Sequence, residues 1–263
     1  MPEAPEPLPS SSQASSFIMA PYSNRIRDGK FTALGREYQL RFAEKHAIHG
    51  DVRNRSWQVT DVRADLVTLR FDSTHYPDIN FPFPFSATTT IQVSGASLSQ
   101  KLTLTNCSDF AMPAGFGFHP YFNRSLISPQ EDVSAQFLCG AVYPHEDTVP
   151  LPTGPAIPLS SHLSYADFRT LERGLDHCFR DWDGSANFAW SMSRIRMNIS
   201  AKSPLTHLIV YTPADSARFA FEPATHAIDS FNLSSQGIEQ TGTQFLTPGE
   251  SLEGEWSLAL SEE

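Results

Sequence analysis

The stretch FSATTTIQVSGASLSQKLTLTN, residues 85–106, predicts two antiparallel β-strands joined by a tight turn. Along its second half, one set of alternate side chains is apolar apart from a single glutamine, and the other set is polar: Leu98, Gln100, Leu102 and Leu104 against Ser99, Lys101, Thr103 and Thr105. This alternation is typical of a strand with one face against a core and the other in water. The glycine of Ser94-Gly95-Ala96 marks the turn.

Short apolar segments of the same kind occur along the rest of the chain, separated by turn residues. We predict further strands at Lys30–Ala33, Glu37–Leu40, Ser56–Arg63, Asp65–Phe71, Val133–Phe137, Phe188–Ser191, Ile195–Ala201, His207–Thr212, Arg218–Glu222, Gly242–Leu246 and Leu252–Leu260. Only Tyr165–Arg173 is predicted to be helical. So many short strands predict an all-β, largely antiparallel sandwich or barrel with very little helix.

The first 16 residues, MPEAPEPLPSSSQASS, differ from the rest because they are mostly proline, serine, glutamate and alanine. Such a segment cannot bury enough apolar surface to offset the entropy lost on ordering. We therefore predict that residues 1–16 are disordered and that residues 17–263 form one domain.

Charge and cysteine content exclude several classes of function. The formal net charge of −10 argues against a nucleic-acid partner, because phosphate binding needs clustered Lys and Arg. No apolar run approaches the ~20 residues that cross a bilayer, so we expect no membrane association. The three cysteines, Cys107, Cys139 and Cys178, show no paired spacing, and no signal-peptide pattern begins the chain. This combination predicts reduced thiols in the cytoplasm.

The densest cluster of polar and aromatic residues is PAGFGFHPYFN, residues 113–123, with His119 near its centre. Its two glycines allow the backbone to approach another group closely. Pro120 biases His119 toward an extended conformation, which directs the imidazole along a sheet face. A histidine in an aromatic corner is more often structural than catalytic, but sugar rings stack on aromatic faces, which favours a binding role here.

Two further segments carry acids beside apolar residues. Glu222 ends an apolar strand and precedes a proline, where partial desolvation raises a carboxyl pKa and makes the group a better base. An exposed glutamate on an edge strand is the alternative. Asp176 follows the Gly174 turn in GLDHCF, residues 174–179, where an Asx turn would also explain an aspartate.

The segments PYSNRIRDG, residues 21–29, and HAIHG, residues 46–50, contain the remaining polar candidates. His46 and His49 have a spacing that zinc sites use. No HExxH motif or cysteine partner follows, and Gly50 indicates a loop, so we expect no metal.

Together these segments resemble the aldose 1-epimerase, or galactose mutarotase-like, superfamily. The matching stretches occur in the family's order: PYSNRIRDGKF (21–31), HAIHG (46–50), LTNCSDFAMPAGFGFHPYF (104–122), LPTG (151–154), GLDHCF (174–179), FEPATHAIDSFN (221–232) and LTPGESL (246–252). They are most similar to a bacterial subgroup of epimerase-like proteins. One departure is Asp51, which replaces the commoner second glycine after His49.

The resemblance implies a β-supersandwich with a sugar-binding concave face, acting without a cofactor as a monomer or homodimer. His119 falls on the family's general acid and Glu222 on its general base. Arg25, His49 and Asp176 fall on substrate-binding positions. Mutarotation needs one base at the C1 hydroxyl and one acid at the ring oxygen, so we expect an ionised Glu222 and a cationic His119 on opposite sides of the acetal carbon.

Three alternatives remain open from the sequence. A glycoside hydrolase could use Glu222 and Asp176 as a carboxylate pair, which requires about 5–9.5 Å between them. An epimerase for a sugar phosphate could bind the phosphate through Arg27, Arg53 and Arg55. A non-catalytic carbohydrate-binding protein could share the fold.

Overall fold

A computed structural model describes residues 14–146 and 149–262. Most of the predicted disordered segment, residues 1–13, therefore lies outside the described residues. The remainder of that segment makes an ordered contact, because the Tyr121 N–H donates to the Ser15 carbonyl at 2.8 Å. No helix in the described ranges is long and apolar enough to cross a membrane.

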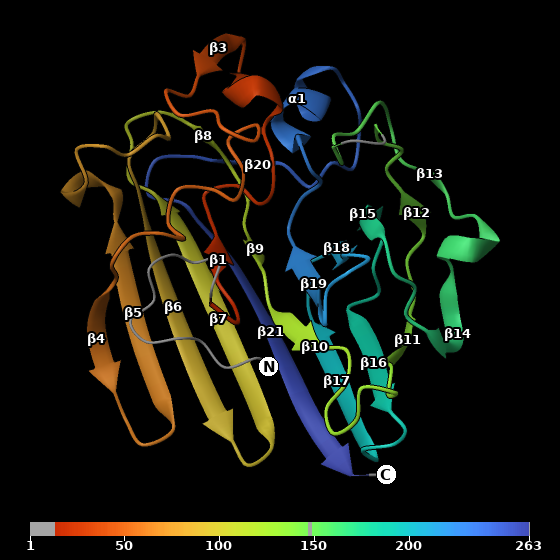
Figure 1. Cartoon of the computed structure of the whole chain (residues 1–263). Helices are drawn as coiled ribbons and strands as arrows, with labels where there is room; N and C mark the ends of the chain where they lie inside the picture. Colours follow the sequence, from red (N-terminus) through yellow and green to blue (C-terminus); the bar gives the residue numbers. More distant parts are fainter. Residues whose placement is uncertain (1–13, 147–148, 263) are drawn as a thin grey trace.

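The larger of two main sheets has nine strands in the order β14-β11-β16-β17-β21-β7-β6-β5-β4 (Figure 1). In that order the strands span Tyr165–Thr170, Ser134–Phe137, Ser185–Trp190, Ile195–Ala201, Ser251–Glu262, Ser97–Asn106, Phe85–Ser94, Leu66–Asp72 and Gln58–Val62. All their pairings are antiparallel. The hairpin predicted at residues 85–106 is β6–β7 and lies within this sheet, and its predicted bounds are confirmed.

The second main sheet has eight strands in the order β1-β9-β19-β18-β15-β12-β13, with β10 also paired to β19. The strands of that path span Ile18–Met19, Gly117–Phe118, Arg218–Ala224, His207–Thr212, Leu175–Arg180, Ala141–Val142 and Ile157–Pro158, and β10 spans Tyr121–Asn123. The two sheets form the largely antiparallel sandwich that the sequence predicts.

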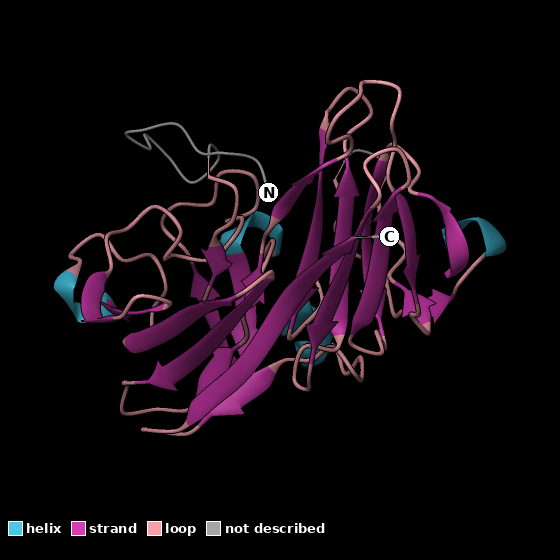
Figure 2. Cartoon of the chain, turned by 90° about the horizontal axis from the view of Figure 1, so that it is seen from below, coloured by secondary structure: helices cyan, strands magenta, loops and turns pink. Residues whose placement is uncertain are grey.

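Smaller elements complete the described chain, and helical segments are few and short (Figure 2). They are the hairpin β2 (Lys30–Ala33) and β3 (Arg36–Gln39), the pair β8 (Met112–Ala114) and β20 (Gln244–Leu246), the helix α1 (Ser230–Ser235), and the 3-10 turns η2 (Arg27–Gly29), η3 (Ser73–His75) and η4 (Ser161–Leu163).

The predicted helix at Tyr165–Arg173 is wrong. Residues Tyr165–Thr170 form β14, which pairs antiparallel with β11 at the edge of the nine-stranded sheet. Only the end residue Tyr165 is buried in this mostly exposed strand, so its sequence lacks a strong period of two. Pairing with β11 decides the conformation, because tertiary context overrides a weak local preference. The α-helix that the structure does contain, α1, was not predicted.

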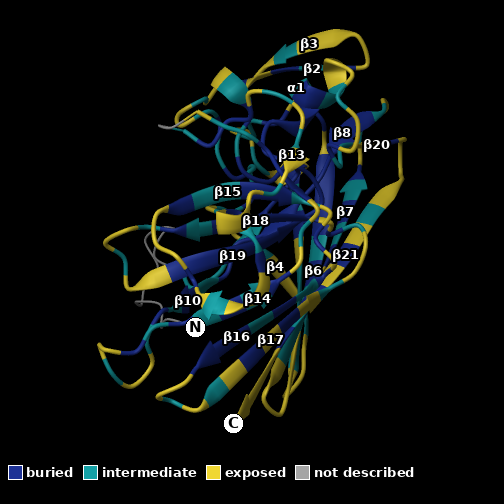
Figure 3. Ribbon diagram, turned by 90° about the vertical axis from the view of Figure 1, so that its right-hand side faces the viewer, coloured by how far each residue is buried: buried dark blue, intermediate teal, exposed yellow. Residues whose placement is uncertain are grey.

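The register of the eight-stranded sheet separates its side chains into two faces. Phe118, Phe221 and Val210 belong to the main hydrophobic core between the two sheets. Their neighbours along each strand point the other way, because successive strand residues alternate between faces. Figure 3 shows β19 and the middle of β18 buried, so both faces of these strands are covered.

The two glycines of the 113–123 cluster do allow close approach, as predicted. A Cβ on Gly115 would lie 1.8 Å from Cδ2 of the buried His226, and one on Gly117 would lie 2.8 Å from the Met19 side chain in β1. The His226 ring in turn accepts from the Ser23 N–H at 2.9 Å, which fixes the segment before Arg25.

We expect Gly115→Ala to lower the free energy of unfolding by about 1–3 kcal/mol, because a methyl group there overlaps the His226 ring. Gly154→Ala is the matched control, since its Cβ meets no atom within 4 Å and a surface change of this kind stays within about 0.5 kcal/mol. Urea unfolding of both variants checks this. Equal stabilities would show that the 113–123 backbone moves away without cost.

Candidate active site

Three strands of the eight-stranded sheet place polar side chains on one face. Asp176 in β15 pairs with Tyr211 in β18, and Tyr211 pairs with Ala220 in β19. Glu222 lies two residues after Ala220 and therefore points to the same face. Cross-strand partners share a face, so Asp176, Tyr211 and Glu222 lie side by side although 46 residues separate the first from the last.

His119 reaches this face from the neighbouring strands. Gly117 pairs with Ala224 of β19, and two residues further on His119 points the same way as Glu222. The His119 N–H donates to the Phe17 carbonyl at 2.9 Å, and the Phe17 ring stacks on the imidazole with 4.4 Å between centroids. The centroid of the Tyr121 ring also lies near the imidazole, 4.8 Å from its centroid.

The central contact of the site joins His119 Nε2 and Glu222 Oε1 at 3.1 Å. Both residues are buried, with 3% and 1% of their surface exposed. Their predicted positions on opposite sides of the acetal carbon stay a prediction. They are in direct contact on the wall of one cavity.

Arg25 and His49 come from two loops that are bonded to each other. The His49 N–H donates to the Asn24 carbonyl at 2.6 Å, and the Asp229 N–H donates to the Arg25 carbonyl at 2.9 Å. The His49 ring meets His119 edge to face at 5.0 Å. These backbone bonds hold both predicted binding residues beside the catalytic candidates.

All five predicted site residues line one cavity of about 480 Å³. These residues are His119, Glu222, Arg25, His49 and Asp176. A cavity of this size is in the range that small-molecule sites occupy. Further residues also line it: Phe17, Asn24, Lys45, Ile48, Arg53, Asn54, Tyr121 and Tyr211. Of these, only Arg53 was given a role from the sequence, as one of three arginines that could bind a phosphate.

Some of these additional residues carried a partial sequence signal. Tyr121 is part of the 113–123 cluster, and Tyr211 is the last residue but one of a correctly predicted strand, His207–Thr212. Which face Tyr211 occupies depends on its pairing with Asp176, and that register is a tertiary property. Lys45 and Arg53 flank the HAIHG segment without belonging to it.

Several polar atoms in this site lack a hydrogen-bond partner among the described residues. They are His49 Nδ1, His119 Nδ1 and Glu222 Oε2. Buried polar atoms are nearly always paired in folded proteins, because leaving one unpaired costs about 1–3 kcal/mol. A gathering of such atoms at one cavity is what a site for a polar ligand requires.

Burial opposes charge on both members of the central pair. It lowers the pKa of His119 to about 3 and raises the pKa of Glu222 well above its ordinary value. Nearby Asp176 raises the Glu222 pKa further, and Arg25 lowers it. Burial thus favours the uncharged form of each group, while the 3.1 Å contact also suits an ion pair. The ionised Glu222 and cationic His119 expected from the sequence stay a prediction.

His46 and His49 have separate surroundings. His46 Nδ1 accepts from the Asp28 N–H at 3.0 Å, whereas His49 faces the cavity. Asp51 is the residue that departs from the family pattern. Its Oδ2 accepts hydrogen bonds from the N–H groups of Asn80 at 2.5 Å and Phe81 at 2.9 Å. Asp51 thus ties the loop behind His49 to the segment before β6 (Phe85–Ser94).

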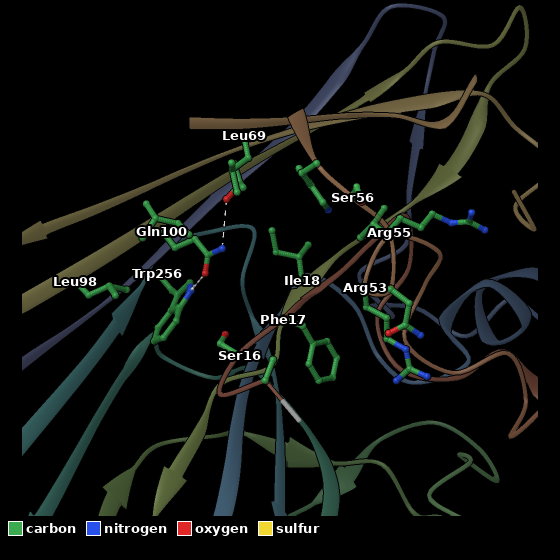
Figure 4. A pocket seen from close by; sticks show the side chains of 16 residues that line it. Ser16, Phe17, Ile18, Arg53, Arg55, Ser56, Leu69, Leu98, Gln100 and Trp256 are labelled. Atoms are coloured by element: carbon green, nitrogen blue, oxygen red, sulfur yellow. Dashed lines mark hydrogen bonds between the residues drawn. The ribbon is translucent and has the colours of Figure 1, made fainter. Parts of the chain in front are cut away.

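A larger, mostly apolar cavity of about 620 Å³ adjoins the first and shares Phe17, Arg53 and Asn54 with it (Figure 4). Its wall on the nine-stranded sheet includes Leu69 and Trp256. There the Trp256 indole N–H donates a hydrogen bond to Gln100 Oε1 at 3.3 Å. Titratable groups are sparse in this cavity, so the acid/base chemistry belongs to the smaller one.

The paired imidazole and carboxyl group thus lie on one face of a sandwich of two largely antiparallel sheets. A sequence model of the family "Aldose 1-epimerase" matches residues 5–259, so the chain belongs to the aldose 1-epimerase family. It is 28% identical to YphB of Escherichia coli K12 over 94% of this chain and 84% of that protein. It is also 28% identical to YihR of the same organism, over 88% and 76%.

Solved structures show the same fold. A putative aldose 1-epimerase from E. coli K12 superposes with a TM-score of 0.80 at 23% identity, covering 97% of this chain and 86% of that one. A galactose mutarotase-like protein from Clostridium acetobutylicum superposes with a TM-score of 0.79 at 21% identity, covering 95% and 79%. At these identities the superpositions establish the fold.

The raised pKa of Glu222 predicts a pH-dependent stability difference for Glu222→Gln. Folding favours the protonated carboxyl, so the wild type loses stability as pH rises from about 4.5 toward the higher folded-state pKa. Each pKa unit between the unfolded and folded states corresponds to about 1.4 kcal/mol in the free energy of unfolding. Gln is always neutral and can still donate to His119.

We therefore expect Glu222→Gln to be about as stable as wild type at pH 4 and more stable at pH 8, as measured by urea unfolding. Glu37→Gln, at an exposed position paired with Lys30, is the control and should show no such trend. A constant difference between wild type and Glu222→Gln across this pH range would contradict a protonated, buried Glu222.

Proposed function

We propose that this protein is an aldose 1-epimerase that interconverts the α and β anomers of a free monosaccharide. The observation that carries the proposal is the contact of 3.1 Å between His119 Nε2 and Glu222 Oε1 at a cavity whose wall holds unpaired polar atoms. The family membership supports the same reaction class.

The side-by-side arrangement suits the two oxygens that the reaction must address. In a cyclic aldose, the C1 hydroxyl and the ring oxygen are both bonded to C1, so they lie close together. An acid and a base at hydrogen-bond distance from each other can each reach one of these oxygens. Neither a nucleophile nor a redox step is needed for ring opening.

In the proposed reaction, the Glu222 carboxylate removes the C1 hydroxyl proton while the His119 imidazolium protonates the ring oxygen. The bond between C1 and the ring oxygen breaks as the C1 carbonyl forms. Rotation about C1–C2 exposes the other carbonyl face, and the reverse transfers close the ring. Each positioned acid or base contributes about 10²–10⁴-fold.

The proton transfers of this reaction agree with the buried environment of His119 and Glu222. Ring opening converts the charged pair, Glu222 carboxylate and His119 imidazolium, into the uncharged pair that burial favours. The charged pair forms by moving one proton from Glu222 to His119. Arg25 favours this transfer because its positive charge lowers the Glu222 pKa. Sugar hydroxyls bonded to Glu222 Oε2 and His119 Nδ1 would favour it further.

The alternatives fit the site less well. A glycoside hydrolase needs two carboxyl groups across the scissile bond, whereas the group in contact with Glu222 is an imidazole. A purely carbohydrate-binding role has no use for a buried acid/base pair, which costs stability. Binding of sugars without faster mutarotation would establish that role instead.

The direct test is polarimetry of freshly dissolved α-glucose and α-galactose with purified protein. We expect wild type to accelerate relaxation, and Glu222→Gln and His119→Gln each to lower kcat by about 10²–10⁴-fold, because each removes one proton-transfer group. Glu37→Gln, an exposed glutamate, should match wild type. Wild type and Glu222→Gln relaxing at equal rates would exclude the proposed mechanism.

Asp176 is proposed to bind sugar hydroxyls, so its role differs from proton transfer. We expect Asp176→Asn to raise KM by about tenfold with a smaller change in kcat, since a charge-assisted hydrogen bond is lost in both ground and transition states. Asp167→Asn, on the exposed part of β14, should leave both constants unchanged. A fall in kcat as large as that of Glu222→Gln would instead make Asp176 a catalytic residue.

A further inference from the structure

The larger cavity, of about 620 Å³, has no part in the proposed reaction. It adjoins the catalytic cavity and shares Phe17, Arg53 and Asn54 with it. Its lining is mostly apolar, and the buried amide of Gln100 interrupts that lining on the nine-stranded sheet. A mostly apolar cavity of this size with a few oriented polar groups has the properties of a small-molecule site.

The cavity lies where the inner face of the nine-stranded sheet is left partly uncovered. Along β7 (Ser97–Asn106), Leu102 and Leu104 are fully buried in the main core. Leu98 belongs to the same face but is only partly buried and lines the cavity. Leu69 in β5 and Ile91 in β6 are partly buried there as well. An apolar group in the cavity would cover these three side chains and remove their surface from water.

Gln100, the single glutamine on the apolar face of β7, is held in one orientation at the cavity wall (Figure 4). The Trp256 indole N–H can only donate, so the Gln100 atom that meets it at 3.3 Å is the carbonyl oxygen. Gln100 Nε2 then donates to Thr89 Oγ1 at 3.3 Å. The Thr89 hydroxyl itself donates to the Lys101 carbonyl at 2.9 Å, so its oxygen is free to accept.

The oriented amide keeps hydrogen-bonding capacity for a ligand. A glutamine amide has two N–H donors and two acceptor lone pairs. Among the described residues, the Gln100 side chain forms one hydrogen bond as donor and one as acceptor. One N–H and one lone pair are left at a side chain that is only 8% exposed. The cavity therefore suits an apolar group that contains a carbonyl oxygen.

Phe17 connects this cavity to the reacting part of the sugar. Its ring stacks on the His119 imidazole with 4.4 Å between centroids, and it lines both cavities. In the proposed reaction His119 protonates the ring oxygen, which is bonded to C1 and C5. In that arrangement C5 and its substituent C6 lie on the His119 side of the sugar, toward Phe17, and the C1 hydroxyl lies toward Glu222.

We propose that the larger cavity is a substrate subsite for an acyl group on C6 of the aldose. The acyl chain packs against Leu69, Ile91 and Leu98, and the acyl carbonyl accepts the remaining Gln100 N–H. The sugar ring occupies the catalytic cavity, and the acyl group passes Phe17 at the shared wall. This inference rests on the proposed epimerase function and names its substrate class, aldoses that are acylated at C6.

The test compares kcat/KM for mutarotation of glucose and of 6-O-acetyl, 6-O-butanoyl and 6-O-hexanoyl glucose, each corrected for its uncatalysed rate. Burial of one methylene group favours binding by about fourfold, so kcat/KM should rise by about that factor with each methylene until the cavity is filled. We expect the best ester to exceed glucose by about tenfold or more. Values that do not rise with chain length, or glucose equal to or better than all three esters, would overturn the proposal.

N-butanoyl glucosamine tests the position of the group, because it has the same acyl chain on C2. We expect its kcat/KM to be below that of 6-O-butanoyl glucose, since only C6 lies toward the shared wall. A higher value for the C2 derivative would overturn the placement of C6 at the larger cavity.

Variants connect the preference to the named residues. Leu69→Asn places an amide in the apolar lining and should lower the ratio of the 6-O-hexanoyl to the glucose rate constant by about tenfold. Gln100→Met removes the N–H and should lower this ratio by about 2- to 10-fold. Leu260→Asn, the same change as at Leu69 but at an exposed position, should keep the wild-type ratio. Unchanged ratios in both cavity variants would overturn the subsite.

Calorimetric titration separates this inference from the proposed function, because equilibrium binding does not depend on turnover. Tighter binding of 6-O-hexanoyl glucose than of glucose, weakened in Leu69→Asn, would support the subsite even if no sugar mutarotated faster. Faster mutarotation of glucose without tighter binding of the ester would support the epimerase and exclude the subsite.

Discussion

The contact of 3.1 Å between His119 Nε2 and Glu222 Oε1 is the constraint on which the candidate site depends. Both groups are buried, and burial opposes charge on each of them. The reaction proposed here requires one proton to move from Glu222 to His119, and their contact gives that proton a short path.

The eight-stranded sheet provides this contact through its register. One face of β19 (Arg218–Ala224) contributes Phe221 to the core, and the other face contributes Glu222 to the cavity. A shift of one residue between β18 and β19 would exchange these two side chains. The core thus fixes the chemistry, because the free energy of burying Phe221 specifies which way Glu222 points.

Charge in the cavity is arranged unevenly around this pair. Arg25 faces acids, whereas Arg53 faces an aromatic ring and neutral phenols. Arg55, two residues beyond Arg53, is neutralised by Asp51 and Asp78 and serves the loop. Arginines in neighbouring positions therefore have different surroundings.

The sequence alone determined the all-β class and the bounds of hairpin β6–β7, because the alternation of apolar and polar residues is a local property. The five site candidates came from short motifs that resemble a known family. The sequence misassigned Tyr165–Thr170 because that edge strand carries no strong alternation, and pairing with β11 settled its conformation. Tertiary structure alone decided that His119 and Glu222 are in contact and buried, and that Tyr211, Lys45 and Arg53 line the same cavity. Contacts and burial arise between segments that are distant in the chain, so no local pattern could encode them.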